Sequence, residues 1–275
     1  MNTEEWRLID SGISDAYYNM ALDEAVMKAH RQNLVPPTIR FYGWSPPGLT
    51  LGYFQQIDRE VDREACTRYN IDIVRRLTGG RAILHDDELT YSIITTNDEK
   101  YLPSGILDSY KIISKGIING LKNIGLKVEL KPVEKGKKAG TGFSPACFDA
   151  PSWYEVVADG KKLVGSAQTR QQGIVLQHGS IPFTLDEDLL FSILKTGSDR
   201  VKERLKEKFR RKATAVNYQS DKKPDIQTVK NAIRHGWEKV FSVKITEDEL
   251  LPEEKKWAQE LKVNKYATED WNARR

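Results

Sequence analysis

Three strand-like segments follow one another in the second half of the chain, with only short connections between them. They cover residues 153–158, 162–168 and 173–179, and Asp159-Gly160 marks a turn between the first two. Strands joined by so few residues pair antiparallel, because a parallel connection needs a dozen or more residues. This part of the chain is therefore predicted to form an antiparallel meander.

Strand-like and helix-like patterns alternate along the rest of the chain. Asp15 is expected to cap a helix that runs to about Arg31, and Gly125 to stop a helix over residues 107–124. Residues 38–44 and 49–54 are expected to pair as strands around a proline turn. Further helices are expected over residues 185–194, 200–209, 226–241 and 247–261.

These patterns predict an α/β (α+β) fold, with a mixed, antiparallel-rich central sheet flanked by helices. We expect one domain over residues 1–248 and a short helical C-terminal tail over residues 249–275. A chain of 275 residues is long enough for one large domain with such an appendage.

The composition argues against several classes of protein. The formal net charge of +4 is a mild excess, which suits an acidic protein partner at least as well as nucleic acid. The sequence has no run of 18 apolar residues and no signal-peptide pattern, so we expect no membrane insertion. Two cysteines without a secretion signal predict the cytoplasm. The cysteine and histidine spacing predicts no metal site.

Cys147 is the first candidate for chemistry. It lies in residues 142–151, a segment that glycine and proline interrupt too often for a regular helix or strand. A thiol in a loop, with Lys162 downstream and able to reach it, suggests thioester chemistry. The alternative is a small buried side chain, which is the commoner fate of a free cysteine.

A Gly-Gly segment between two strand-like runs is the second candidate. Paired glycines at Gly79 and Gly80 allow a backbone to approach a ligand closely and to offer its N–H groups to a carbonyl or phosphate. Arg75 and Arg76 precede them and supply charge for a carboxylate or phosphate. The adjacent acid, Asp86, is in a position to orient His85. A plain hairpin turn between two strands is the alternative.

Two strand segments carry the remaining candidates. If side chains alternate along a strand from Lys162, then Lys162 and Val164 share one face and Gly165 lies on the other. Gly165 leaves room for a ligand. His178, followed by Gly179, is placed to orient a substrate or to act as a base. The alternatives are an exposed lysine and a structural, hydrogen-bonded histidine.

Together these segments resemble the biotin/lipoate protein ligase superfamily. The stretch from Arg75 to Asp86 resembles its Arg-Arg-x-[Ser/Thr]-Gly-Gly-x-Ala-x-x-His-Asp signature. The Lys-x-x-Gly-Ser-Ala element aligns its lysine with Lys162 and also includes Gly165, Ser166 and Ala167. Gln-His-Gly-Ser-Ile, which contains His178 and Gly179, aligns with a third element, and Asn19-Met-Ala-Leu-Asp23 also fits. The resemblance implies the mixed-sheet catalytic fold of that superfamily.

Within the superfamily, the Ser-Pro-Ala-Cys-Phe segment around Cys147 resembles the Gram-positive type of octanoyltransferase. The resemblance implies a cysteine thioester, with octanoyl-acyl carrier protein as donor and the lipoyl domain of the glycine cleavage H protein as acceptor, and no cofactor. Lipoate ligases typically carry a C-terminal accessory domain, for which the tail here is too small. The alternatives are an ATP-dependent lipoate ligase, an amidotransferase between lipoyl domains and a non-catalytic acyl-binding protein.

The resemblance implies catalytic roles for Cys147, as the nucleophile, and for Lys162, as a charge that favours the thiolate or as a base. It implies acyl-substrate binding by a larger set of residues. These are Arg75, Arg76, Gly79, Gly80, His85, Gly165, Ser166, Ala167, His178 and Gly179.

Overall fold

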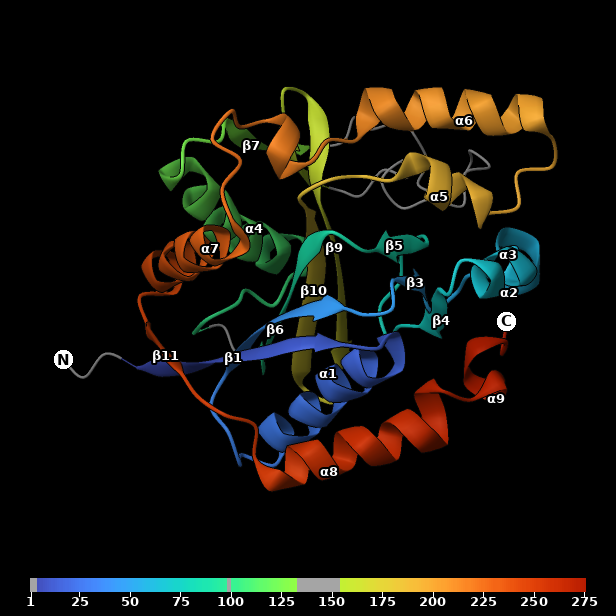
Figure 1. Cartoon of the computed structure of the whole chain (residues 1–275). Coiled ribbons are helices and arrows are strands. Elements are labelled where there is room, and N and C mark those ends of the chain that lie inside the picture. Colours follow the sequence, from blue (N-terminus) through green and yellow to red (C-terminus); the bar gives the residue numbers. More distant parts are fainter. Residues whose placement is uncertain (1–3, 98–99, 133–153) are drawn as a thin grey trace.

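The structure, a computed structural model, describes residues 4–97, 100–132 and 154–275 (Figure 1). Its strands are β1 (Glu5–Ser14), β2 (Thr38–Trp44), β3 (Gly48–Leu51), β4 (Asp72–Arg75), β5 (Ile83–His85), β6 (Glu88–Thr96), β7 (Val128–Pro132), β8 (Tyr154–Ala158), β9 (Lys161–Gln171), β10 (Ile174–Pro182) and β11 (Lys244–Glu247). Its longer helices are α1 (Ala16–Arg31), α4 (Ile106–Asn123), α6 (Asp199–Lys212), α7 (Ile226–Phe241) and α8 (Pro252–Leu261). Short helical segments are α2 (Ile57–Glu60), α3 (Arg63–Arg68), α5 (Glu187–Ser192), η2 (Val216–Tyr218), η3 (Lys262–Tyr266) and α9 (Glu269–Asn272).

Two sheets organise the molecule. The large sheet has the strand order β11-β1-β2-β6-β10-β9-β8-β7, and a small sheet has the order β4-β3-β5. In the large sheet β1 pairs parallel with β2 and β11, whereas the other ladders are antiparallel. The predicted mixed, antiparallel-rich sheet is therefore confirmed, and β8, β9 and β10 form the predicted meander.

Helices cover both faces of the large sheet. On one face α4 and α7 bury a core that includes Ile117, Val175 and Trp237. On the other face α1 packs against β6 and β10, and α8 packs on the outside of α1. Figure 1 shows α4 and α7 side by side at one flank, with α1 and α8 at another. In the described part of the chain, we find no helix that is long and apolar enough to cross a membrane.

The first residue of α1 and the last residue of α4 are set by the residues that flank these helices. The Oδ1 atom of Asp15 accepts the backbone N–H of Tyr18 at 2.9 Å and caps α1, as predicted. Gly125 takes a φ of +93° directly after α4, a conformation that glycine adopts at little cost and that ends the helix.

Two expectations about strands are wrong. Residues 38–44 and 49–54 do not pair, because both edges of β2 are occupied, one by β1 and the other by β6. The chain instead carries β3 into the small sheet, between β4 and β5. The helix expected from residue 247 begins only at Pro252, because Lys244–Glu247 is strand β11, paired with β1.

Candidate functional site

A bulge in β9 decides which face of the sheet Lys162 occupies. Val156 of β8 pairs with Val164, and its neighbour Val157 pairs with Lys162, so Leu163 has no residue opposite it. Because Val156 and Val157 point to opposite faces, Lys162 and Val164 also lie on opposite faces. The expectation that they share a face is wrong, since one extra residue reverses the alternation. Lys162 instead lies on the face that carries Gly165.

Lys162 is held in place from two sides. Its side chain is 4% exposed, and Nζ lies 3.1 Å from Oε1 of Glu155 on β8. Its backbone carbonyl accepts the N–H of Thr214 at 2.9 Å, just beyond the C-terminus of α6. A buried ammonium beside a carboxylate is a fixed, charged group, and an exposed surface lysine is thereby excluded.

The same face of β9 and β10 carries the other strand candidates. Ala167 pairs with His178 and Gly165 pairs with Ser180 across the ladder, which places these four residues on one face. Gly179 points the other way. A Cβ added there would lie 2.6 Å from both the Gly165 carbonyl oxygen and Oγ of Ser166, so only glycine fits between the strands.

The Gly-Gly segment is not a hairpin turn. Strands β4 and β5, on either side of it, do not pair with each other, since both flank β3. The Arg76 guanidinium organises the loop by donating to the carbonyl oxygens of Thr50, Gly79 and Arg81 at 2.8–3.0 Å. Gly80 has a φ of +99°, and its carbonyl approaches Gly52 so closely that a Cβ there would lie 2.1 Å away.

His178 belongs to a buried polar network. Its Nδ1 lies 3.2 Å from Oδ2 of Asp23, and its Nε2 lies 2.7 Å from Oγ1 of Thr78. Asp23 also pairs with Arg40 at 2.6 Å and accepts the Ser92 hydroxyl at 2.8 Å. Burial alone would raise the pKa of Asp23. The charge of Arg40 and the hydrogen bond from His178 have a larger combined effect, and they hold the pKa of Asp23 below its usual value.

Protonation of His178 provides a test of this network. Burial lowers the pKa of His178, although Asp23 opposes the shift. In the unfolded chain, His178 binds a proton near pH 6.5, whereas in the folded protein it binds that proton only at lower pH. The free energy of unfolding should therefore fall as the pH drops below about 6.5. We expect His178→Gln to weaken this slope, measured by denaturant unfolding from about pH 5.5 to 8. Equal slopes in both proteins would contradict the assignment, because His30, whose pKa burial also lowers, is common to both.

His85 is oriented by Glu88 and Thr50, not by Asp86. Its Nδ1 lies 2.8 Å from Oε1 of Glu88, and its Nε2 lies 2.9 Å from Oγ1 of Thr50. The ring stacks on Trp44 with centroids 4.1 Å apart. Because both ring nitrogens have partners, the orientation of the His85 ring is fixed.

Several of these groups, but not Lys162, Gly79 or Gly80, line a small cavity between the two sheets. It measures about 20 Å³ and is lined by Met20, Tyr42, Trp44, Thr50, Arg76, Ile83, His85, Thr90, Gly165, Ala167, His178, Gly179 and Ser180. Six of the predicted residues are therefore brought together. Ser166 faces the other way, with Oγ 2.7 Å from the Tyr91 hydroxyl. Cys147 lies outside the described residues.

Arg75 lies away from this cavity. Its fully buried guanidinium donates to the carbonyl oxygens of Gly52, Gln55 and Asn272 at 2.7–3.0 Å. Its backbone N–H also donates to Oδ1 of Asn272 at 2.8 Å. In this geometry Arg75 ties the C-terminal tail to the small sheet.

Sequence reasoning missed Asp23, Thr78 and Glu88 as parts of the site. Asp23 lies in the Asn19-Met-Ala-Leu-Asp23 motif, which was available as a signal. Thr78 and Glu88 stand inside or beside the Gly-Gly motif, and only the fold shows that they bond to His178 and His85.

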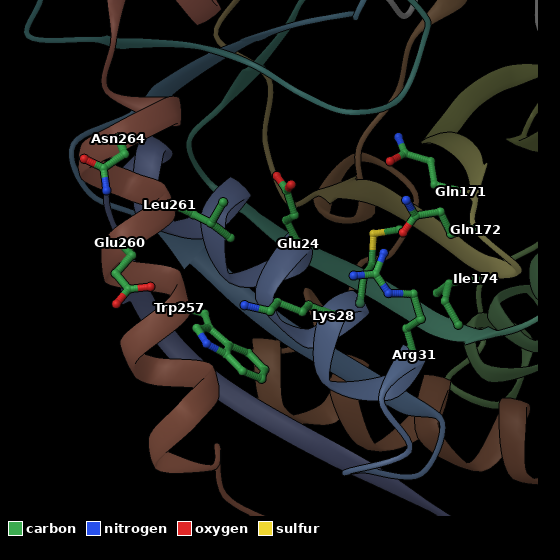
Figure 2. A pocket seen from close by; sticks show the side chains of 11 residues that line it. Glu24, Lys28, Arg31, Gln171, Gln172, Ile174, Trp257, Glu260, Leu261 and Asn264 are labelled. Carbon is green, nitrogen blue, oxygen red and sulfur yellow. The ribbon is translucent and has the colours of Figure 1, made fainter.

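A larger pocket, of about 340 Å³, lies elsewhere (Figure 2). It is formed by α1, α8 and the turn between β9 and β10, with Lys28 Nζ 3.8 Å from the ring centroid of Trp257. None of the predicted site residues lines it. The volume of a pocket therefore does not identify the candidate site in this protein. The smaller cavity is the candidate site because motif residues line it.

Known sequences that are similar to this chain belong to the superfamily that its motifs resemble. Residues 15–238 match the family described as lipoyl protein ligase A/B catalytic domain. Octanoyltransferase LipM of Anoxybacillus flavithermus is 47% identical, and octanoyltransferase LipM of Bacillus subtilis is 44% identical. Both alignments cover 100% of this chain and 100% of the relative.

Solved structures share the fold. A bipartite lipoate protein ligase from Thermoplasma acidophilum matches with a TM-score of 0.80 at 24% identity, over 99% of this chain and 97% of that one. Lipoate-protein ligase A bound with ATP matches with a TM-score of 0.78 at 26% identity, over 98% of each chain. These likenesses match the mixed-sheet catalytic fold that the sequence predicts.

Proposed function

The chain belongs to the lipoyl protein ligase A/B family and is an octanoyltransferase of lipoate biosynthesis, and we propose that it carries the octanoyl group as a thioester on Cys147. The identity of 44–47% to octanoyltransferases LipM, over the whole of both chains, is the observation that carries the activity. The family acts on proteins that contain a lipoyl domain. We propose octanoyl-acyl carrier protein as the donor and the lipoyl domain of a glycine cleavage H protein as the acceptor.

In the first half-reaction, the thiolate of Cys147 attacks the carbonyl carbon of the donor thioester. A new bond from sulfur to the acyl carbon forms, the corresponding bond to the carrier breaks, and the carrier thiolate leaves and takes up a proton. The bonds broken and formed are alike, so this exchange needs neither ATP nor a metal to drive it. Lys162 supports the proposal, because Glu155 fixes its buried ammonium, and an ammonium that lies beside a thiol favours the thiolate.

In the second half-reaction, the amine of the acceptor lysine attacks the acyl carbon, an amide forms, and Cys147 leaves as a thiolate. The attacking amine must lose a proton. Acylation removes the negative charge on Cys147, so Lys162 releases its proton to solvent at less cost; its neutral amine then accepts the proton of the attacking amine, and the ammonium is restored as the Cys147 thiolate leaves. Glu155, 3.1 Å from Nζ, keeps the lysine in position through both steps.

The cavity between the sheets supports binding of a medium acyl chain. Met20, Trp44 and Ile83 give it an apolar wall, and Gly165 leaves the strand surface open on the face that also carries Lys162. Six buried methylenes would contribute about 5 kcal/mol. At about 20 Å³ the cavity has room for about one water molecule, so its walls must part when the chain enters.

Incubation with each possible acyl donor tests the proposal. Wild-type protein mixed with octanoyl-acyl carrier protein should gain one octanoyl group, seen by intact mass, without ATP. Octanoate plus ATP should leave the mass unchanged and form no acyl-adenylate. Formation of adenylate, together with no adduct from the carrier, would contradict a thioester mechanism and favour a ligase.

A further inference from the structure

Helix α6 carries a strongly basic surface, and the chain that follows it contacts the backbone of Lys162. Its 14 residues, DRVKERLKEKFRRK, include eight basic and three acidic side chains. Leu205 and Phe209 pack into the hydrophobic core that also contains Leu49 of β3, which fixes the side of the helix that faces inward. The chain leaves α6 at Ala213, which bridges to Lys162, and the N–H of Thr214 donates to the Lys162 carbonyl oxygen.

Three arginines line the outward side of α6. Arg200, Arg204 and Arg211 are spaced by four and seven residues, so they lie within about 40° of one another around the helix and opposite Phe209. All three are exposed, and within the described residues no ion pair involves them. Glu207 lies in the same stripe.

Other basic side chains of α6 are already paired. Lys206 contacts Asp188 at 2.7 Å and Glu203 at 3.3 Å, and Arg210 pairs with Glu187 of α5. These pairs fix α6 to α5. The three outward arginines have no such role in the described structure, so their charge is available to a partner.

We propose that this arginine stripe is the docking surface for the donor, an acidic carrier protein that holds its acyl group as a thioester on a long flexible arm. The inference rests on the proposed function. Charge of one sign along a helix steers an oppositely charged protein and fixes its orientation. The stripe leads to the backbone that holds Lys162, so a partner seated on it lies beside the site.

The length of α6 favours the donor over the acceptor. A helix of 14 residues extends about 21 Å, so a protein that covers its outer face has its centre well away from Lys162. A thioester at the end of a long arm spans such a distance. The acceptor lysine reaches only the length of its own side chain, so the acceptor domain must sit at the mouth of the site.

Charge reversal on the stripe tests the proposal. For Arg204→Glu combined with Arg211→Glu, we expect the KM for octanoyl-acyl carrier protein to rise about 10-fold, with kcat changed less than about 2-fold. The rate with octanoyl-pantetheine, which has no protein surface, should stay at the wild-type value. In the wild type, the KM for the carrier should rise with ionic strength.

Lys255→Glu combined with Lys256→Glu is the matched control. Both lysines are exposed on α8, which Figure 1 shows on the opposite side of the molecule from α6. The control reverses the same charge and should leave the KM for the carrier unchanged. Should the first variant fail to fold, Arg200→Glu replaces it, because an acid in the first turn suits the helix dipole, and a rise in KM of about 3-fold is expected.

An unchanged KM for the carrier in the α6 variants would overturn the proposal, as would an equal rise in the α8 control. A rise in the KM for the lipoyl domain alone would assign the surface to the acceptor and also overturn it. Failure of the proposed function looks different, because wild-type protein would then acquire no octanoyl group from the carrier or from octanoyl-pantetheine.

Discussion

Replacement of Cys147 by alanine is expected to abolish octanoyl transfer, with a loss in kcat of at least about 10³-fold. The variant should also acquire no octanoyl group from the carrier, because the proposed intermediate is a covalent thioester on that sulfur. Intact mass after incubation with octanoyl-acyl carrier protein measures the adduct, and transfer to a lipoyl domain measures turnover. An adduct that survives in the variant would place the acyl group elsewhere and contradict the mechanism.

The second cysteine of the chain provides a matched control. Cys66 lies in α3 with a side chain 1% exposed, and burial raises the pKa of its thiol to about 12. A thiol of that pKa has almost no thiolate at neutral pH and does not exchange with a thioester. We therefore expect Cys66→Ala to retain both the adduct and the transfer rate, with some loss of thermal stability because a buried side chain becomes smaller.

The parts of the fold that the sequence predicts are those set by local rules. Short connections force antiparallel pairing of β8, β9 and β10, and the carboxylate of Asp15 caps α1 through its own first turn. Local rules do not predict strand β11. It is four residues long, and it exists because it pairs with β1, more than 200 residues away in the sequence.

The two adjacent arginines show why only part of the site is predictable. In extended backbone, Arg75 and Arg76 must point in opposite directions, so one motif cannot send both into one cavity. The sequence does not say which of them faces the site. The structure directs Arg76 to the Gly-Gly loop and Arg75 to the carbonyl of Asn272. That choice depends on how the C-terminal tail packs, which the motif does not encode.

The bulge at Leu163 likewise depends on contacts that the local sequence does not show. Alternation from Lys162 predicts a face shared with Val164, and the extra residue in β9 reverses that prediction. A bulge is defined by the partner strand, here β8, so no pattern within β9 reveals it. Its consequence is functional, because it places the ammonium of Lys162 on the same face as Gly165.

Removal of the charge of Lys162 is expected to have the second largest effect on octanoyl transfer. In Lys162→Met, which keeps a side chain of similar length, transfer should fall about 10²–10³-fold. The pH at which iodoacetamide alkylates Cys147 at half its maximal rate should also rise, because the ammonium no longer favours the thiolate. Cys66 is buried and does not interfere with that measurement.

Two further variants separate the roles of Lys162. Lys162→Arg keeps the charge but does not release a proton near neutral pH, so acylation of Cys147 should continue while transfer to the acceptor slows. Lys161→Met is the control, because the neighbouring side chain points to the opposite face, and its rates should stay within about 2-fold of the wild type. If Lys162→Arg transfers at the wild-type rate, Lys162 is not the proton acceptor. Its charge, fixed beside Glu155, would then account for its whole contribution.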